Sequence, residues 1–134
     1  MSEQLAKQFI EALGRLEAGR DVETITSLFA DECEVGNVTS PDKFRGREGA
    51  REFWGAKYRD TFGEVRSTFR NVFATENRAA LEWTTEGTSS DGAPLKYEGV
   101  SILETDGGQI TRFCAYFDAG HLGRQILHQA QGRG

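Results

Sequence analysis

The sequence predicts an α+β fold in which N-terminal helices pack on a strongly curved antiparallel sheet and a last helix follows the sheet. In the first part of the chain, apolar residues recur with the period of an α-helix. From Glu64 onward they recur at every second position, which is the period of a half-buried strand. Helices followed by a run of strands indicate an α+β fold rather than alternating βαβ units.

Two helices are expected at the N-terminal end. The apolar face of the first helix consists of Leu5, Phe9, Leu13 and Leu16. Gly19 is expected to end this helix, because glycine commonly occupies the position after a last turn. Asp21 is expected to cap the second helix, since its side chain can accept hydrogen bonds from the free N–H groups of a first turn. The apolar face of the second helix consists of Val22, Ile25, Leu28 and Phe29.

A short strand, a loop and a third helix are expected before the long strands. The segment Cys33 to Val38 is partly β-branched and predicts a strand. Pro41 indicates a loop over Thr39 to Gly46. The pattern from Arg47 to Phe62 predicts a helix.

The second half of the chain predicts an antiparallel meander. Its expected strands are Val65 to Phe73, Ala79 to Thr88, Leu95 to Glu104 and Ile110 to Phe117. The turn sequences between them contain Asn77, Asp91-Gly92 and Asp106-Gly107-Gly108. A final helix is expected over Ala119 to Ala130.

The sheet face away from the helices is expected to be partly apolar. Val72, Val100 and Ile102 share one alternation phase and have charged neighbours. We interpret this face as the interface of a homodimer, and exposure of these side chains on a monomer is the alternative.

Composition excludes several classes of function. Among 134 residues, 28% are charged and the net charge is −5, with no basic stripe, so no nucleic-acid partner is predicted. The apolar runs are far shorter than the roughly 20 residues that span a bilayer, so no membrane partner is predicted. Without a recognisable secretory signal, a cytoplasmic location is expected.

The cysteines and histidines predict no metal site. Cys33 and Cys114 are expected to be buried, reduced thiols. His121 and His128 lie seven positions apart, which matches no zinc-ligand spacing. Because no Gly-rich loop follows a strand, no organic cofactor is predicted either.

Four local strings, taken in order, carry a resemblance to a known family. They are Leu28 to Glu32 (LFADE), Phe44 to Gly49 (FRGREG), Trp83, and Ile110 to Asp118 (ITRFCAYFD). In this order the chain resembles the nuclear transport factor 2-like superfamily, and within it the SnoaL-like proteins of the polyketide cyclase and limonene epoxide hydrolase-like branch. The resemblance implies one cone-shaped, cystatin-like domain over residues 1–134. It also implies an enclosed, mostly apolar pocket that binds a small organic ligand.

Similarity to limonene-type epoxide hydrolases implies catalytic roles for Asp118 and Asn37, which would hold the attacking water. In an apolar pocket, desolvation would raise the pKa of Asp118 and make it a usable general base. Capping of the last helix is the alternative role of Asp118, and a turn position is that of Asn37.

Glu86 or Glu82 is the candidate for the second carboxylate, provided that their face of the strand, rather than the face of Trp83, lines the pocket. If their face is turned to water, both are ordinary solvated charges. The arginine of the hydrolase motif would fall at Thr84 and its tyrosine at Val35, so the family's catalytic set is incomplete.

Two other enzymes of the superfamily match less well. The two acid positions of ketosteroid isomerase fall at Asn37 and near Val100, and its tyrosine position falls at Leu13. Because none of the three chemical groups is present, that mechanism is excluded. The cyclases use a histidine on the strand before the acid, whereas His121 and His128 follow the last strand.

The sequence therefore leads to two hypotheses. The first is a SnoaL-like protein that binds a small apolar molecule, with or without cofactor-independent hydrolysis, cyclisation or isomerisation of that molecule through Asp118. The second is a non-catalytic dimer that binds ligands or a partner. The expected ligand-binding residues are Tyr116, Trp83, Trp54, Tyr58 and Cys114.

Overall fold

The computed structural model describes residues 2–38, 42–58 and 62–132, without the side chains of Lys57 and of residues 126–132. Within these ranges the helices are α1 (Ser2–Gly19), α2 (Val22–Thr26), α3 (Gly46–Glu52) and α4 (Ala119–Gly132), with a π-helix, η1 (Phe53–Tyr58), directly after α3. The strands are β1 (Phe29–Asn37), β2 (Phe44–Arg45), β3 (Phe62–Ala74), β4 (Arg78–Ser89), β5 (Pro94–Asp106) and β6 (Gln109–Phe117).

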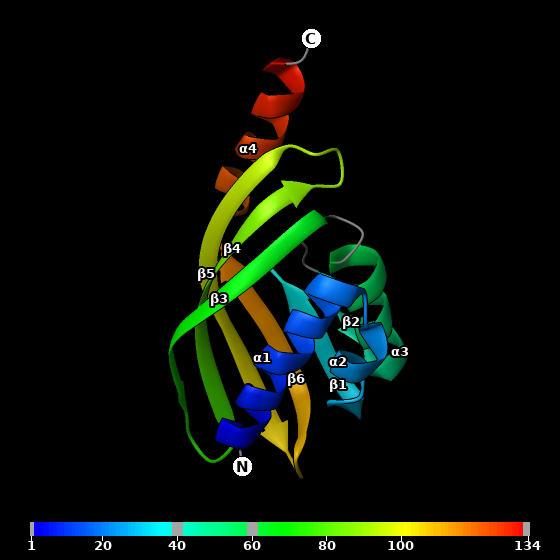
Figure 1. Ribbon diagram of the computed structural model, residues 1–134. Helices are drawn as coiled ribbons and strands as arrows, with labels where there is room; N and C mark the ends of the chain where they lie inside the picture. The colour runs from blue at the N-terminus through cyan, green and yellow to red at the C-terminus, as the bar shows by residue number, and fades with distance from the viewer. Residues whose placement is uncertain (1, 39–41, 59–61, 133–134) are drawn as a thin grey trace.

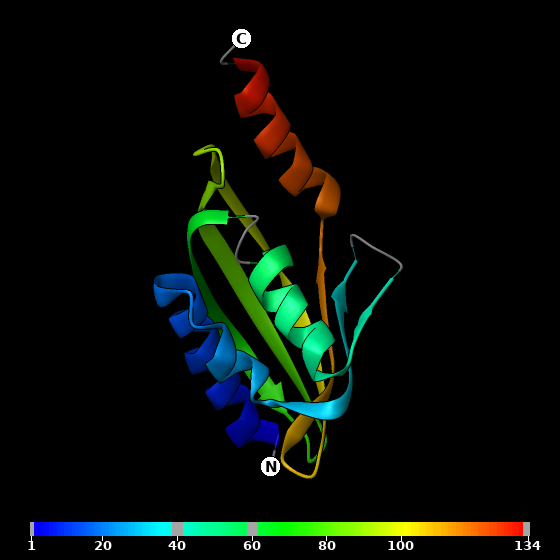
Figure 2. The same ribbon diagram turned by 90° about the vertical axis from the view of Figure 1, so that its right-hand side faces the viewer.

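The described strands form one curved sheet in the order β2-β1-β6-β5-β4-β3. The antiparallel meander predicted from the alternating pattern is confirmed for β3 to β6, and β1 adds to it in parallel beside β6. Helices α1, α2 and α3 lie on one side of the sheet, and α4 projects beyond its end (Figures 1 and 2). The α+β fold expected from the sequence is therefore confirmed.

The first helix follows the predicted pattern, and the second is shorter than expected. Leu28 and Phe29, expected on its apolar face, follow its end at Thr26. All four residues of the expected apolar face of α1 are buried. Asp21 caps α2, and its carboxylate accepts hydrogen bonds from the Thr24 backbone N–H (3.1 Å) and hydroxyl (2.6 Å). These contacts fix the turn between the two helices, and Ile25 of α2 is fully buried in the core.

The third predicted helix is shorter and less regular than expected. It starts one residue earlier, at Gly46, and changes to π-helical hydrogen bonding at Phe53. Phe62, expected at its end, is instead the first residue of β3. π-helical turns are rare in proteins, and those that occur are often found at functional sites. Here the turn carries Phe53, Trp54 and Tyr58 toward the interior.

Two further segments differ from the prediction. The first strand begins at Phe29 rather than Cys33, because α2 ends at Thr26. Part of the expected loop, Phe44–Arg45, pairs with Glu34 and Val35 as β2. The rest of that prediction includes residues 39–41, which lie outside the described residues.

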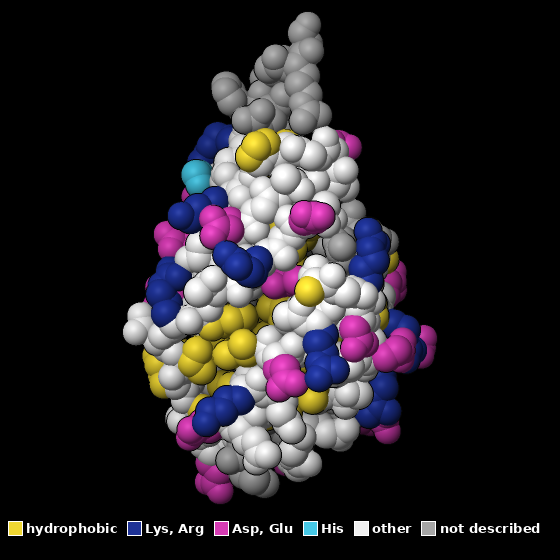
Figure 3. All heavy atoms as spheres, in the orientation of Figure 1, with side chains coloured by type: hydrophobic (Ala, Val, Ile, Leu, Met, Phe, Trp, Pro, Cys, Tyr) yellow, Lys and Arg dark blue, Asp and Glu magenta, His cyan; other side chains and the backbone are white. Residues whose placement is uncertain are grey.

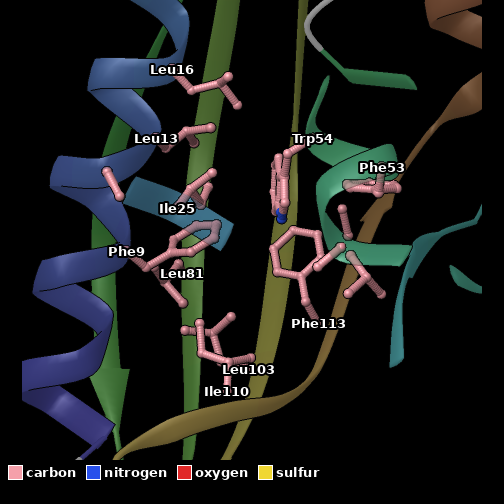
Figure 4. Packing of buried hydrophobic residues seen from close by; sticks show 14 of the residues in the cluster. Phe9, Leu13, Leu16, Ile25, Phe53, Trp54, Leu81, Leu103, Ile110 and Phe113 are labelled. Atoms are coloured by element: carbon pink, nitrogen blue, oxygen red, sulfur yellow. The ribbon is translucent and has the colours of Figure 1, made fainter. Parts of the chain in front are cut away.

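The core lies between the helices and the inner face of the sheet. Phe9 and Leu13 of α1 point toward Trp54 and Phe113 (Figure 4), and the ring centroids of Trp54 and Phe113 lie 5.0 Å apart. Both cysteines are buried and unpaired, as predicted.

A bulge in β3 changes which apolar residue faces outward. Asn71 adopts a positive φ of 52°, and the pairing with β4 shifts between Arg70 and Phe73. Phe73 is consequently opposite Ala80, which pairs with Ile102. The expected alternation, which gives Val72 the phase of Val100 and Ile102, is therefore wrong beyond the bulge, where Phe73 takes that phase.

On the face seen in Figure 3, Lys and Arg are interspersed with Asp and Glu, and a group of hydrophobic side chains is exposed at the lower left. No described helix is long and apolar enough to cross a membrane.

Candidate functional site

A cavity of about 220 Å³ lies between the helices and the concave face of the sheet. It is lined by Phe9, Leu13, Asn37, Phe53, Trp54, Tyr58, Phe62, Ser67, Phe69, Trp83, Thr85, Tyr97, Ser101, Phe113, Ala115, Phe117 and Leu122. At roughly 30 Å³ per water molecule, this volume equals about seven waters and is smaller than most pockets for drug-sized ligands. The cavity therefore suits a compact molecule.

Aromatic rings make up much of the wall. Tyr97 is the centre of this arrangement, with ring centroids 5.2 Å from those of Trp83 and Phe117 and 6.1 Å from that of Phe62. The ring of Phe62 in turn lies 5.2 Å from that of Tyr58. Rings at these separations pack favourably and are rigid, so they define the shape of the cavity.

The position of Trp83 depends on a glycine in the neighbouring strand. Gly99 pairs with Trp83, and a Cβ atom at this position would lie 3.0 Å from the indole ring and 2.2 Å from the Tyr116 carbonyl oxygen. The absent side chain leaves room for the indole, whose N–H donates to the Ser101 hydroxyl at 2.9 Å. The indole N–H of Trp54 has no partner among the described residues and points toward the ring of Phe113 (Figure 4).

Helix α4 contributes to the cavity through Leu122. The helix is held by Gln125, whose side-chain amide accepts from the Lys96 N–H and donates to the Lys96 carbonyl, both at 2.8 Å. The pairing of β5 with β6 begins at Gly99, so Gln125 satisfies backbone groups of β5 beyond this pairing.

A buried carboxylate, Glu17 of α1, lies behind the cavity wall. Glu17 is 7% exposed. Its Oε2 atom accepts from the Tyr58 and Ser67 hydroxyls, both at 2.6 Å, and its Oε1 atom accepts from the Ser67 N–H at 2.9 Å. The Ser67 hydroxyl also lies 2.6 Å from that of Thr85. Glu17 thereby connects α1, η1 and β3 beside the cavity.

The Glu17 carboxylate fixes the direction of the neighbouring hydroxyl protons. A hydroxyl has a single proton, and those of Tyr58 and Ser67 are donated to Glu17. Thr85 must then donate to Ser67. Burial and the negative charge of Glu17 raise the pKa of Tyr58, and the same two causes raise the pKa of Tyr97. Both phenols therefore stay neutral around the cavity.

Four of the predicted site residues line the cavity. They are Asn37, Trp54, Tyr58 and Trp83. Asn37 lies at the end of β1, and its backbone carbonyl accepts from the Lys43 ammonium at 2.9 Å. The odd-numbered face of β4, which carries Trp83, is the inner one, and this decides an alternative that the sequence left open.

Asp118 lies outside the cavity lining, on the surface. Its carboxylate accepts from the His121 backbone N–H at 2.9 Å at the start of α4. This hydrogen bond lowers the pKa of Asp118, so the expectation that desolvation would raise it is wrong. Asp118 shares the alternation phase of Arg112, Cys114 and Tyr116, as expected, but that phase faces away from the cavity.

The remaining predicted residues also lie away from the cavity. Glu86 is exposed on the outer side of β4. Tyr116 is 44% exposed, and its hydroxyl accepts from Arg112 at 3.4 Å. Cys114 is buried but alternates with Phe113 and Ala115, which line the cavity, so it belongs to the opposite face. The structure thus does not bring Asp118, Asn37 and Glu86 together.

The polar group of Glu17, Ser67 and Thr85 is not among the site residues predicted from the sequence. One signal could have found Glu17: it continues the i, i+4 series Leu5, Phe9 and Leu13 on the buried side of α1. Ser67 and Thr85 occupy inward positions of β3 and β4 and are partners in the register. Among the described residues, no three His, Cys, Asp or Glu side chains lie close enough to hold a metal ion.

The helices on a curved sheet and the cavity between them define a nuclear transport factor 2-like fold, which the structural neighbours share. The model of the SnoaL-like domain matches residues 6–113. The chain therefore belongs to the SnoaL-like domain family. A search of the curated proteins finds no match.

Three solved structures illustrate the range of this fold. An isomerase candidate from Rhodopseudomonas palustris is 19% identical, with a TM-score of 0.81 and coverage of 96% of this chain and 99% of the other. TerC, co-crystallised with polyporic acid, is 21% identical, with a TM-score of 0.78 and coverage of 93% and 97%. An epoxide hydrolase from M. tuberculosis resembling limonene epoxide hydrolase is 18% identical, with a TM-score of 0.72 and coverage of 93% and 91%. At these identities the likeness shows the fold alone.

Proposed function

We propose that this protein binds a small, largely apolar organic molecule in the cavity between the helices and the sheet. The observation that carries the proposal is a wall made mainly of aromatic and aliphatic side chains with a few polar groups, such as Asn37, Ser67 and Thr85. Ligand sites have this composition, because apolar area supplies affinity and a few polar groups fix orientation. The complex of TerC with polyporic acid supports small-molecule binding by this fold.

The geometry favours a protein that binds its ligand without converting it. Hydrolysis, cyclisation or isomerisation through Asp118 would require this carboxylate to reach the ligand. Asp118 instead caps α4 outside the cavity lining. Glu17 is the carboxylate that lies behind the wall, and two of its donors, Tyr58 and Ser67, line the cavity.

Fluorescence gives a direct test, because the only two tryptophans, Trp54 and Trp83, both line the cavity. Benzene and indane are expected to change the emission of the wild type in a saturable way. Ala115→Leu fills the cavity and is expected to abolish the change. Ala80→Leu, the same substitution at a position that faces away from the cavity, should preserve it. Equal responses of the two variants, or no saturable response of the wild type, would contradict the proposal.

We also propose that the outer face of the sheet joins two copies of the chain. Val100 and Tyr116 are direct partners in the register and are 37% and 44% exposed, and Phe73 is 68% exposed. Val100→Lys is expected to shift the protein toward monomer in analytical ultracentrifugation. Gln8→Lys, on the exposed side of α1, adds the same charge and should have no effect. A wild type that is monomeric at high concentration would refute this contact.

A further inference from the structure

A buried negative charge lies behind the mainly apolar wall of the cavity. Glu17 is the one charged residue among the buried polar side chains of the described chain. No ion pair among the described residues involves it. Buried carboxylates are usually paired with a cation, because removal of a charge from water is costly unless a partner compensates it.

The position of Glu17 in its helix adds to the negative potential. Glu17 lies in the last turn of α1, which contains no basic residue. The C-terminal end of a helix carries a partial negative charge and favours cations. The carboxylate and the helix end therefore act in the same direction, and within the described part of the chain the charge is stabilised by hydrogen bonds from Tyr58 and Ser67.

The hydroxyl groups next to the cavity transmit this preference to a ligand. Tyr58 and Ser67 donate their protons to Glu17, and Thr85 donates to Ser67. All three residues line the cavity. Because the protons of all three hydroxyls are engaged in this chain, which ends at the carboxylate, their remaining lone pairs are left to face a ligand, and lone pairs attract positive groups.

The aromatic wall suits the same type of ligand. Tyr58 and Phe62 are in ring contact, as are Phe62 and Tyr97, and Trp83 packs against Tyr97. The faces of aromatic rings attract cations, and the attraction is greatest where water is excluded. Burial and the negative charge of Glu17 both raise the pKa of Tyr97. The electrostatic influence of Glu17 therefore extends to the cavity wall.

We propose that the cavity binds a compact organic ammonium ion with an apolar body, and that its positive charge lies at the end formed by Tyr58, Ser67 and Thr85, in front of Glu17. This inference rests on the proposed function and specifies the class of ligand. It assigns to Glu17 a role in recognition in addition to its role in joining α1, η1 and β3.

The test uses two compounds of the same shape, phenyltrimethylammonium and tert-butylbenzene, of which only the first is charged. Their binding is followed by the indole N–H signals of Trp54 and Trp83 in two-dimensional NMR spectra. The wild type is expected to prefer the cation by about tenfold or more, the size of a desolvated cation–π contact. No preference, or a preference for tert-butylbenzene, would overturn the ammonium proposal and leave the proposed function intact. Failure of both compounds to bind would overturn both.

Glu17→Gln identifies the source of the preference. The amide is close to the carboxylate in size but has no charge, so the affinity for the cation is expected to fall about tenfold while that for tert-butylbenzene is unchanged. Glu11→Gln, on the exposed side of the same helix, is the matched control and should retain the preference. Full preference in Glu17→Gln would overturn the assignment.

A second measurement on the wild type covers the case in which Glu17→Gln does not fold. The N-methyl protons of bound phenyltrimethylammonium are expected to give intermolecular NOEs to the rings of Tyr58 and Tyr97. NOEs to Leu122 and Phe53 without those to Tyr58 and Tyr97 would place the charge elsewhere and overturn the proposal.

Discussion

The carboxylates of Glu17 and Asp118 lie in environments opposite to those that their sequence positions suggest. Glu17 lies in a helix rich in charged residues, yet it is 7% exposed and accepts three hydrogen bonds. Asp118 lies at the end of a strand, where pocket residues are expected, yet it is exposed and caps a helix. The difference shows that the face of an element on which an acid lies matters more than the motif around it.

The largest expected effect concerns the stability contributed by Glu17. Glu17→Ala leaves two hydroxyls and one backbone N–H without their acceptor. Because each unsatisfied buried group costs about 1–3 kcal/mol, the free energy of unfolding should fall by about 3 kcal/mol. Urea denaturation measures this change. Glu11→Ala, at an exposed position of α1, should change it by less than about 0.5 kcal/mol. Similar losses in the two variants would show that Glu17 is not anchored as described.

A smaller effect is expected at alkaline pH. Burial raises the pKa of Tyr58 and Tyr97 above the ordinary value of 10.0, so both phenols are neutral in the folded protein while the unfolded chain ionises. Their contribution to stability is complete below pH 10 and is lost as the pH rises through the folded pKa values. Stability from urea titrations should therefore fall above pH 10, and less steeply in Tyr58→Phe. An identical slope in this variant would contradict the burial of the Tyr58 hydroxyl.

The smallest effect is expected at Asp118. The His121 N–H lowers the pKa of Asp118, so the capping interaction is present above the unfolded pKa and is lost as the pH falls through the folded one. Asp118→Ala should reduce the thermal midpoint slightly at neutral pH and not at acidic pH. Asp118→Asn keeps a capping side chain and should restore most of the loss. A large loss in Asp118→Asn would indicate a role beyond capping.

The sheet could be predicted from the sequence more fully than the segments around it. Alternation and turn residues placed β3 to β6 to within a few residues, because each strand has one buried face and short turns fix the order. The bulge at Asn71 could not be predicted, since a bulge depends on pairing with β4. The π-helical turn at Phe53 arises from packing of its aromatic residues, and no local propensity indicates it.

The candidate site was predicted in part. Trp54, Tyr58 and Trp83 were found because large aromatic side chains on inward faces must line whatever space the fold encloses. Ser67 and Thr85 could not be predicted, because a single hydroxyl residue in a strand does not indicate a site. Only the register between β3 and β4 shows that the two lie side by side. The family resemblance implies a role for Asp118, whereas the carboxylate beside the cavity belongs to α1, for which the resemblance implies no site residue.

The different roles of the two carboxylates can be tested with a single ligand. Isothermal titration of phenyltrimethylammonium into the wild type, Glu17→Gln and Asp118→Asn separates a charge behind the cavity wall from one on the surface. We expect that Glu17→Gln weakens binding about tenfold and that Asp118→Asn leaves the dissociation constant unchanged within about twofold. Unchanged binding in Glu17→Gln, or weaker binding in Asp118→Asn, would contradict the role assigned to Glu17.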